Sequence, residues 1–68
     1  MLKYIEINIE TGWILLYSDG NPYPINIRVI SHVSPHFDNK SVVFRLDGNR
    51  LVVDHPYDEV VKYLKWMI

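Results

Sequence analysis

The chain has 68 residues, no cysteine and a formal net charge of −1. This length predicts a single domain, residues 1–68, with a thin core. The lack of cysteine excludes disulfides, thiolate zinc sites and a cysteine nucleophile. It favours a cytoplasmic location, because small secreted domains usually need disulfides. The near-zero charge argues against a protein whose main task is to bind phosphates.

Alternating residues predict a first strand at residues 3–9. Its isoleucines fall on one face and its polar residues on the other, which is typical of a half-buried strand. These isoleucines are Ile5, Ile7 and Ile9. The charges in this segment argue against a signal peptide or a membrane span. After a turn at residues 10–12, the apolar run at residues 13–17 predicts a second strand.

Turn-forming residues at positions 18–22 separate this strand from the middle of the chain. Pro22 and Pro24 cannot donate to a strand ladder, so this part is predicted to lie at a sheet edge or in a loop. Residues 25–33 resume an apolar pattern of mixed period. They predict a third strand with a bend, and a short helical turn around residues 28–31 is the alternative. Residues 34–40 are predicted to form a loop.

A β-hairpin is predicted from strands at residues 41–46 and 51–54. The favoured register centres the turn on residues 48–49, with Gly48 at positive φ and Asp47 opposite Arg50. A turn centred on residues 47–48 would place Arg45 opposite Arg50, and like charges in that position are unfavourable. One face of the first strand is predicted to carry Val42, Phe44 and Leu46.

A C-terminal helix is predicted from apolar residues that recur at helical spacing. They are Tyr57, Val60, Val61, Leu64, Met67 and Ile68. Pro56 suits the first turn, and the side chain of Asp54 or His55 is expected to cap the helix. Together the elements predict an α+β fold. It consists of a small curved antiparallel sheet of about five strands, with one C-terminal helix packed on one face.

Several short segments follow one another in a recognisable order: residues 19–26 (DGNPYPIN), the apolar residues Val29, Ile30 and Val33, then 42–44 (VVF), 47–48 (DG), 51–53 (LVV) and 57–61 (YDEVV). This order resembles the FlbD-type family of small bacterial proteins linked to flagella and swarming, with related bacterial and phage proteins. The first turn is Asp-Gly where the family has Asn-Gly, and Pro24 interrupts the second strand of the pattern. The resemblance implies a strand-rich fold ending in a helix and a role without catalysis.

Histidines and aspartates supply the best case for a metal site. They are His32, His36 and His55, with Asp38, Asp54 and Asp58. The spacing of His32 and His36 suits metal binding only on a helix, and Ser34 and Pro35 favour a loop there. The chain also has no nucleophile elbow and no glycine-rich phosphate loop. We therefore expect a protein that is not an enzyme and needs neither metal nor cofactor.

The surplus of aromatic residues predicts a binding surface instead. Tyr63, Trp66 and Glu59 lie beside the apolar face of the helix and form a candidate partner-binding flank. The leading hypothesis is a bacterial or phage interaction or regulatory module that docks through this flank or a sheet edge, with a homodimer as one outcome. The alternative is a nucleic-acid-binding regulator. It would use arginines expected on the open sheet face, namely Arg28, Arg45 and Arg50.

Overall fold

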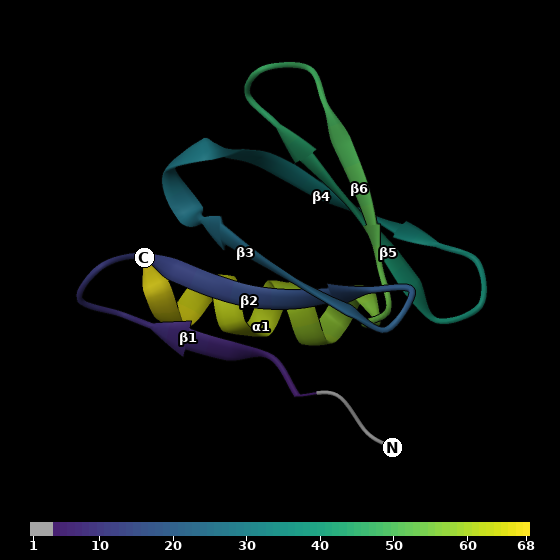
Figure 1. The fold of residues 1–68 in the computed structure, drawn as a ribbon, viewed down its shortest axis with the longest axis horizontal. Helices are drawn as coiled ribbons and strands as arrows, with labels where there is room; N and C mark the ends of the chain where they lie inside the picture. Colours follow the sequence, from purple (N-terminus) through teal and green to yellow (C-terminus); the bar gives the residue numbers. More distant parts are fainter. Residues whose placement is uncertain (1–3) are drawn as a thin grey trace.

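The computed structural model describes residues 4–68 and shows an α+β fold built from two small sheets and one helix (Figure 1). The elements are β1 (Glu6–Asn8), β2 (Trp13–Ser18), β3 (Asn21–Asn26), the 3₁₀ turn η1 (Ile27–Val29), β4 (Ile30–His36), β5 (Lys40–Arg45), β6 (Arg50–Val53) and α1 (Tyr57–Met67). The strands form two antiparallel three-stranded sheets, in the orders β1-β2-β3 and β4-β5-β6. The predicted fold class is confirmed, but the single curved sheet of about five strands is corrected to two separate sheets.

The two sheets separate in the segment that the sequence predicts as one long third strand. The Asn26 side chain accepts a hydrogen bond from Arg28 N at 3.0 Å, which closes the first turn of η1. Gly12 O accepts from Ile27 N at 2.7 Å and fixes this corner against the β1–β2 turn. The chain therefore changes sheet at residues 27–29. The alternative of a short helical turn is confirmed, but the turn begins one residue and ends two residues earlier than expected.

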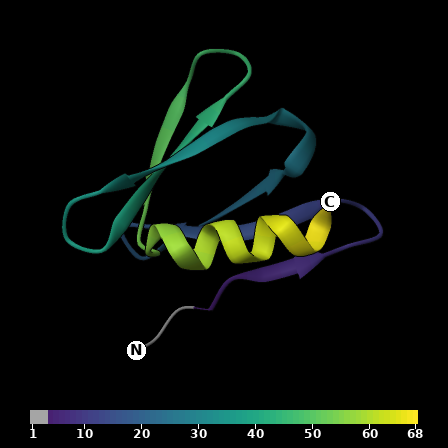
Figure 2. The same ribbon diagram turned by 180° about the vertical axis from the view of Figure 1, so that it is seen from behind.

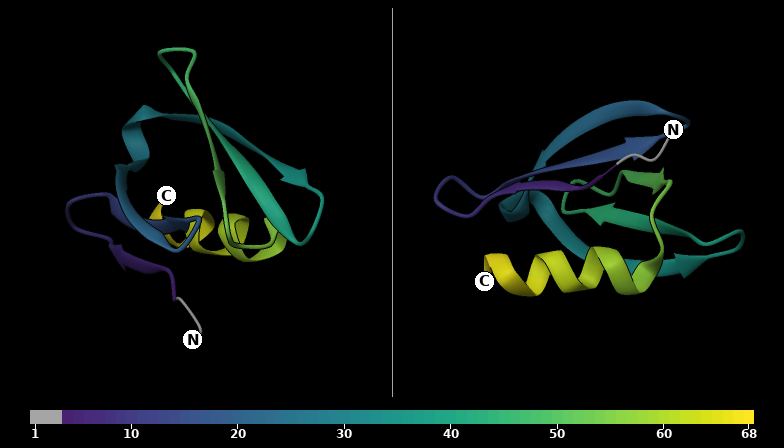
Figure 3. Two further views of the ribbon diagram at one scale, coloured as in Figure 1. Left: turned by 45° about the vertical axis from the view of Figure 1, so that its right-hand side comes forward. Right: turned by 90° about the horizontal axis from the view of Figure 1, so that it is seen from below.

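Both sheets and the helix enclose one apolar core. The buried residues of this core are Ile5, Ile14, Leu16, Ile25, Val43, Val53 and Val60. They come from both sheets and from α1, so no pair of elements closes the core alone. Seen from below, α1 lies along one side of the strands (Figure 3). Within residues 4–68, no helix is long and apolar enough to cross a membrane.

The first strand is shorter than predicted. β1 covers Glu6–Asn8, and Lys3, where the predicted strand begins, lies outside the described residues. Ile5 is buried and Ile7 packs against the core, but Ile9 is 63% exposed in the following turn. Two of the three isoleucines therefore contribute to the core as their alternation predicts.

The prolines occupy an edge strand, as predicted. β3 pairs with β2 on one side, and its other side has no strand neighbour among the described residues. Because Pro22 and Pro24 have no N–H, they fit a strand that is paired on one side only. The β2–β3 turn consists of Asp19 (φ 51°) and Gly20 (φ 78°), and positive φ at both central residues is typical of a tight type I′ hairpin.

The β5–β6 hairpin has a different register from either one considered in the sequence. Phe44 lies opposite Arg50 and Val43 opposite Leu51, so both the predicted pairing of Asp47 with Arg50 and its alternative are wrong. Arg45 N donates to Asn49 O at 2.8 Å, and Gly48 N donates to Arg45 O at 3.1 Å. The turn therefore contains more residues than a two-residue loop, and Gly48 lies in it with a φ of 91°.

The core face of β5 differs only in part from the predicted one, because Val42 on the predicted face is buried as well. Val43 is fully buried together with Ser41, whereas Phe44 is only half-buried and Leu46 is 69% exposed at the turn. Valines occupy positions 42 and 43, so the two faces of this strand have similar apolar character. The Ser41 hydroxyl is accommodated inside because it donates to the backbone oxygen of His55.

The segment predicted as a loop at residues 34–40 is mostly strand. β4 continues to His36 and pairs with β5, with Pro35 opposite Ser41 and His36 opposite Lys40. Only residues 37–39 form the turn, where Asp38 and Asn39 adopt positive φ. Pro35 is compatible with the strand because β4, like β3, is an edge strand.

Candidate functional site

An apolar hollow on the described part of the protein lies between α1 and the start of β4. Its volume is about 480 Å³, and we call it the helix–edge groove. Its walls are formed by Ile27, Ile30, Ser31, His32 and Val33 on one side and by Tyr57, Val61, Leu64 and Ile68 on the other. Most of these side chains are apolar, so the groove presents a surface that favours contact with another apolar surface.

One wall of the groove is a stripe of side chains along α1. Figure 2 shows this helix in front of the strands. Tyr57, Val61, Leu64 and Ile68 are spaced by four, three and four residues, so they lie above one another on the helix. Val60 is fully buried in the core, and it is rotated by about 100° from Val61 around the helix axis. The predicted apolar face of α1 is therefore divided between the core and the groove, and Leu64 contacts both.

The other wall belongs to an open sheet edge. β4 pairs with β5 and has no other strand neighbour among residues 4–68. Backbone groups on the far side of such a strand are available to an added strand. The groove thus combines an apolar lining with an edge that can donate and accept main-chain hydrogen bonds.

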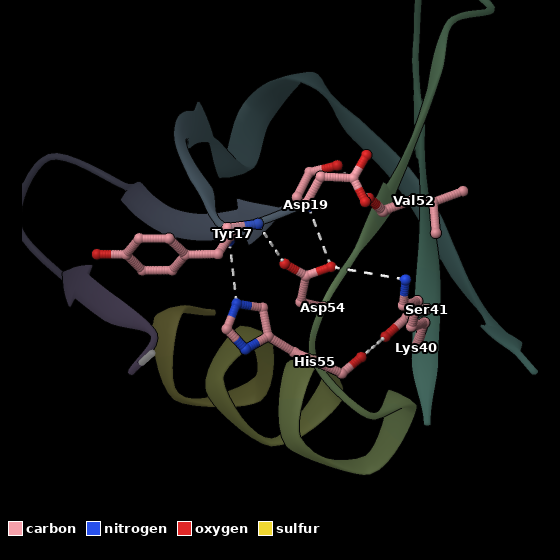
Figure 4. Close-up of polar contacts among 9 residues, drawn as sticks. Tyr17, Asp19, Lys40, Ser41, Val52, Asp54 and His55 are labelled. Carbon is pink, nitrogen blue, oxygen red and sulfur yellow. Dashed lines mark hydrogen bonds and ion pairs between the residues drawn. The ribbon is translucent and has the colours of Figure 1, made fainter. Parts of the chain in front are cut away.

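The start of α1 does not use the predicted caps. Pro56 occupies the N-cap position without a side-chain hydrogen bond to the helix, so the assignment of Asp54 or His55 as the cap is wrong. Both side chains turn instead toward the end of β2 (Figure 4). The first turn of α1 contains the acidic residues Asp58 and Glu59, which suits the positive end of the helix dipole.

Asp54 holds the β2–β3 turn. Its two carboxylate oxygens accept hydrogen bonds from Asp19 N at 3.1 Å and Gly20 N at 2.9 Å. Lys40 Nζ lies 3.9 Å from the same carboxylate, a long ion pair at a partly exposed site. The Gly20 hydrogen bond is the main cause that lowers the pKa of Asp54, with the Asp19 bond and Lys40 acting in the same direction.

His55 connects β2 to the start of α1. Its side chain is 2% exposed, and Nε2 accepts a hydrogen bond from Tyr17 N at 3.0 Å. Because Nε2 is an acceptor here, the ring is neutral and carries its proton on Nδ1. Burial lowers the pKa of His55, and the nearby charges of Glu59 and Asp54 oppose that shift only in part. The residues of this connection therefore serve the fold.

The remaining histidines do not gather with these aspartates. His32 projects from β4 and stacks on Phe44, with the two ring centroids 4.3 Å apart. The ring centroids of His36 and Phe37 are 4.2 Å apart. Among the described residues, no group of three or more histidines and carboxylates is arranged to hold a metal ion. Both histidines lie on β4. The sequence predicts a loop from residue 34 onward, so His36 was expected in that loop.

The predicted aromatic flank is real as a cluster but only partly exposed. Tyr63 is half-buried against the core. The rings of Tyr63 and Trp66 are in an edge-to-face arrangement, with their centroids 5.3 Å apart. Trp66 is 55% exposed, and Lys62 Nζ lies 5.2 Å from the centre of its ring. Glu59 is half-buried on the same helix. The flank thus offers one exposed aromatic side chain, already in contact with a lysine.

The three arginines do not share a face. Arg50 is the cross-strand partner of Phe44, so these two side chains lie on one face of their sheet, and Arg45 lies on the other. Arg45 Nε is 3.5 Å from Asp47 Oδ2, within ion-pair range but too far for a good hydrogen bond. Arg28 is exposed in η1. The structure therefore does not bring them together as the expected basic patch.

Sequence reasoning missed the η1 and β4 wall of the groove. The sequence predicts a continuous strand over residues 25–33, and such a strand would not bring Ile27 and Ile30 next to the helix. In the structure both residues lie beside α1 and line the groove. The sequence did contain a signal for the stripe. The apolar face of α1 includes Tyr57 and Ile68, and these two residues are not needed for the core contact that Val60 and Met67 make. Comparison with known protein families, with curated proteins and with solved structures found no match to the chain.

Proposed function

We propose that this protein is a small non-catalytic interaction module that binds a polypeptide in the helix–edge groove. The observation that carries the proposal is the apolar hollow of about 480 Å³ alongside the unpaired edge of β4 in the described chain. A polypeptide in this position gains apolar contacts from the stripe on α1, and an extended segment also gains main-chain hydrogen bonds from the strand edge, whereas a helix binds through the apolar contacts alone. Both sources of affinity act without a chemical step.

The groove accounts for binding better than the aromatic flank does. Trp66 is one exposed ring whose neighbour Tyr63 is committed to the core. The groove instead presents several apolar side chains around one concave surface, the shape in which binding energy is usually concentrated. The bacterial or phage setting, the cytoplasmic location and the kinship to FlbD-type proteins belong to the same proposal and rest on the sequence.

A peptide selection with matched variants tests this function. A random-peptide display library is selected on the immobilised wild-type chain, and the peptides obtained are titrated against Val61→Asp and Trp66→Ala by fluorescence anisotropy. Val61→Asp puts a charge into the groove, so we expect affinity to fall at least about tenfold. Trp66→Ala removes the exposed ring of the flank and should leave affinity within about twofold.

The controls make the result decisive. Tyr57→Lys is a second groove variant, and because Tyr57 is already 37% exposed, its replacement can change binding without opening the core. Circular dichroism establishes that each variant is folded. Peptides lost on Trp66→Ala and retained on both groove variants would transfer the function to the flank, and failure to select any peptide on a chain that also stays monomeric would contradict the proposal.

A further inference from the structure

The stripe on α1 is complementary to itself when reversed. Its four residues are spaced by four, three and four positions, so the pattern is the same when read from either end. Two such helices in antiparallel orientation place Tyr57 opposite Ile68 and Val61 opposite Leu64 of the other chain. Apolar stripes of this spacing are the usual contact surfaces of paired helices.

Charges beside the stripe favour the same arrangement. Asp58 and Lys65 are seven residues apart and therefore lie on the same flank of α1, on the side away from the core. In a two-fold antiparallel pair, Asp58 of each chain lies next to Lys65 of the other, which gives two attractive pairs. Lys62 is rotated further from the stripe, and its ammonium group lies near the Trp66 ring.

We propose that the polypeptide bound in the helix–edge groove is a second copy of this chain, with the two α1 helices antiparallel. This rests on the proposed function, because it names the partner of the same groove. Ile27 and Ile30 form the second wall that the partner helix meets. The net charge of −1 per chain imposes little long-range repulsion between copies.

The dimer leaves the aromatic flank free. Trp66 lies on the face of α1 turned away from the stripe, and it is already 55% exposed. A two-fold pair therefore displays two copies of the Trp66 flank on its outside. The contact between two helices of this length is small, so association is expected to depend on protein concentration.

Charge reversal tests the pairing. The dissociation constant of the dimer is measured by sedimentation equilibrium for wild type, Asp58→Lys, Lys65→Asp and an equimolar mixture of the two variants. In a dimer of either single variant, like charges face each other across the pair. The dissociation constant should therefore rise about tenfold, and the rise should be smaller at high salt. In the mixed dimer, one chain carries two positive charges at these positions and the other carries two negative charges. Both contacts are then attractive again, so the mixture should recover association near the wild-type constant.

A matched control and a groove variant complete the test. Glu10→Lys makes the same charge change in the exposed β1–β2 turn and should leave the constant unchanged. Val61→Asp should abolish the dimer. A wild-type chain that is monomeric at millimolar concentration, or single variants and a mixture that all associate like wild type, would overturn the antiparallel pair. Peptides that still bind the groove of a monomeric chain would show that the proposed function stands while this inference fails.

Discussion

Asp54 and His55 are expected from the sequence to serve the helix, and they serve the neighbouring strand instead. Asp54 accepts from the two amides of the Asp19–Gly20 turn, and His55 accepts from Tyr17 N. The sequence identifies these residues as structural and their types as hydrogen-bond acceptors. It does not identify the donors, because these lie more than thirty positions away in the chain.

Replacing Asp54 should loosen the β2–β3 turn. In Asp54→Ala both turn amides lose their acceptor, so the free energy of unfolding should fall by about 1 kcal/mol, a value reduced by the partial exposure of the site. Urea denaturation followed by circular dichroism measures the change. Asp38→Asn, in the exposed turn after β4, is the control and should be neutral. Equal stability of the two variants would contradict the role of Asp54.

His55 should make the protein less stable in mild acid. Burial lowers its pKa in the folded state, so the unfolded chain binds the proton more readily. The stabilisation is complete above the unfolded value of about 6.5, and it is lost as pH falls from there through the lower folded value. Urea denaturation between pH 8 and pH 5 should show this loss.

A variant separates His55 from the other titrating groups. In His55→Gln the side-chain oxygen can still accept from Tyr17 N but does not titrate in this range, so the decline of stability below about pH 6.5 should flatten. His32→Gln, at an exposed position, should retain the wild-type slope. An unchanged slope in His55→Gln would assign the acid sensitivity to another group.

Among the elements, the turns show how far local sequence determines structure. The Asp-Gly pair at positions 19–20 lies in the predicted turn and closes a tight hairpin that was not predicted, whereas the Asp-Gly pair at positions 47–48 lies in a longer turn with another register. Positive φ at Gly48 could be predicted. The pairing could not, because it depends on burying Val43 and Val53 against α1 and the other sheet, a contact between distant segments.

The β1–β2 turn should tolerate substitution less well than the β2–β3 turn. Gly12 and Gly20 both have positive φ, so alanine at either position costs about 1 kcal/mol in backbone strain. A Cβ at Gly12 would also approach Ile27 Cγ2 to 3.1 Å, whereas a Cβ at Gly20 meets nothing within 4 Å. Gly12→Ala should therefore lower the midpoint of thermal unfolding more than Gly20→Ala does. The reverse order would contradict the close contact between this turn and η1.

At the scale of the whole molecule, the helix is shared between two surfaces. The sequence predicts α1 and its apolar residues. Val60 and Val61 are adjacent on the helix and face different directions, so Val60 lies in the core and Val61 lines the groove. Which half of the face meets the core is decided by the position of the two sheets, and that position follows from the corner at η1. The groove was therefore not predictable without the arrangement of the sheets.

Thermal stability should depend on protein concentration. If folded chains associate through the groove, raising the concentration stabilises the folded state by mass action, so the midpoint of unfolding should rise with concentration. The Val61→Asp variant, which cannot pair, should unfold at one temperature over the same range. Differential scanning calorimetry from about 0.02 to 2 mM measures both. A wild-type midpoint independent of concentration would contradict association.

The most direct test of the groove as the surface that joins two copies of the chain is an isotope-filtered nuclear Overhauser experiment on a mixture of ¹³C-labelled and unlabelled chains. The antiparallel pair predicts contacts between the Tyr57 ring of one chain and the Ile68 methyl groups of the other, and between Val61 and Leu64. Contacts between chains that involve only Trp66 and Tyr63, or the absence of any contact between chains at millimolar concentration, would contradict it.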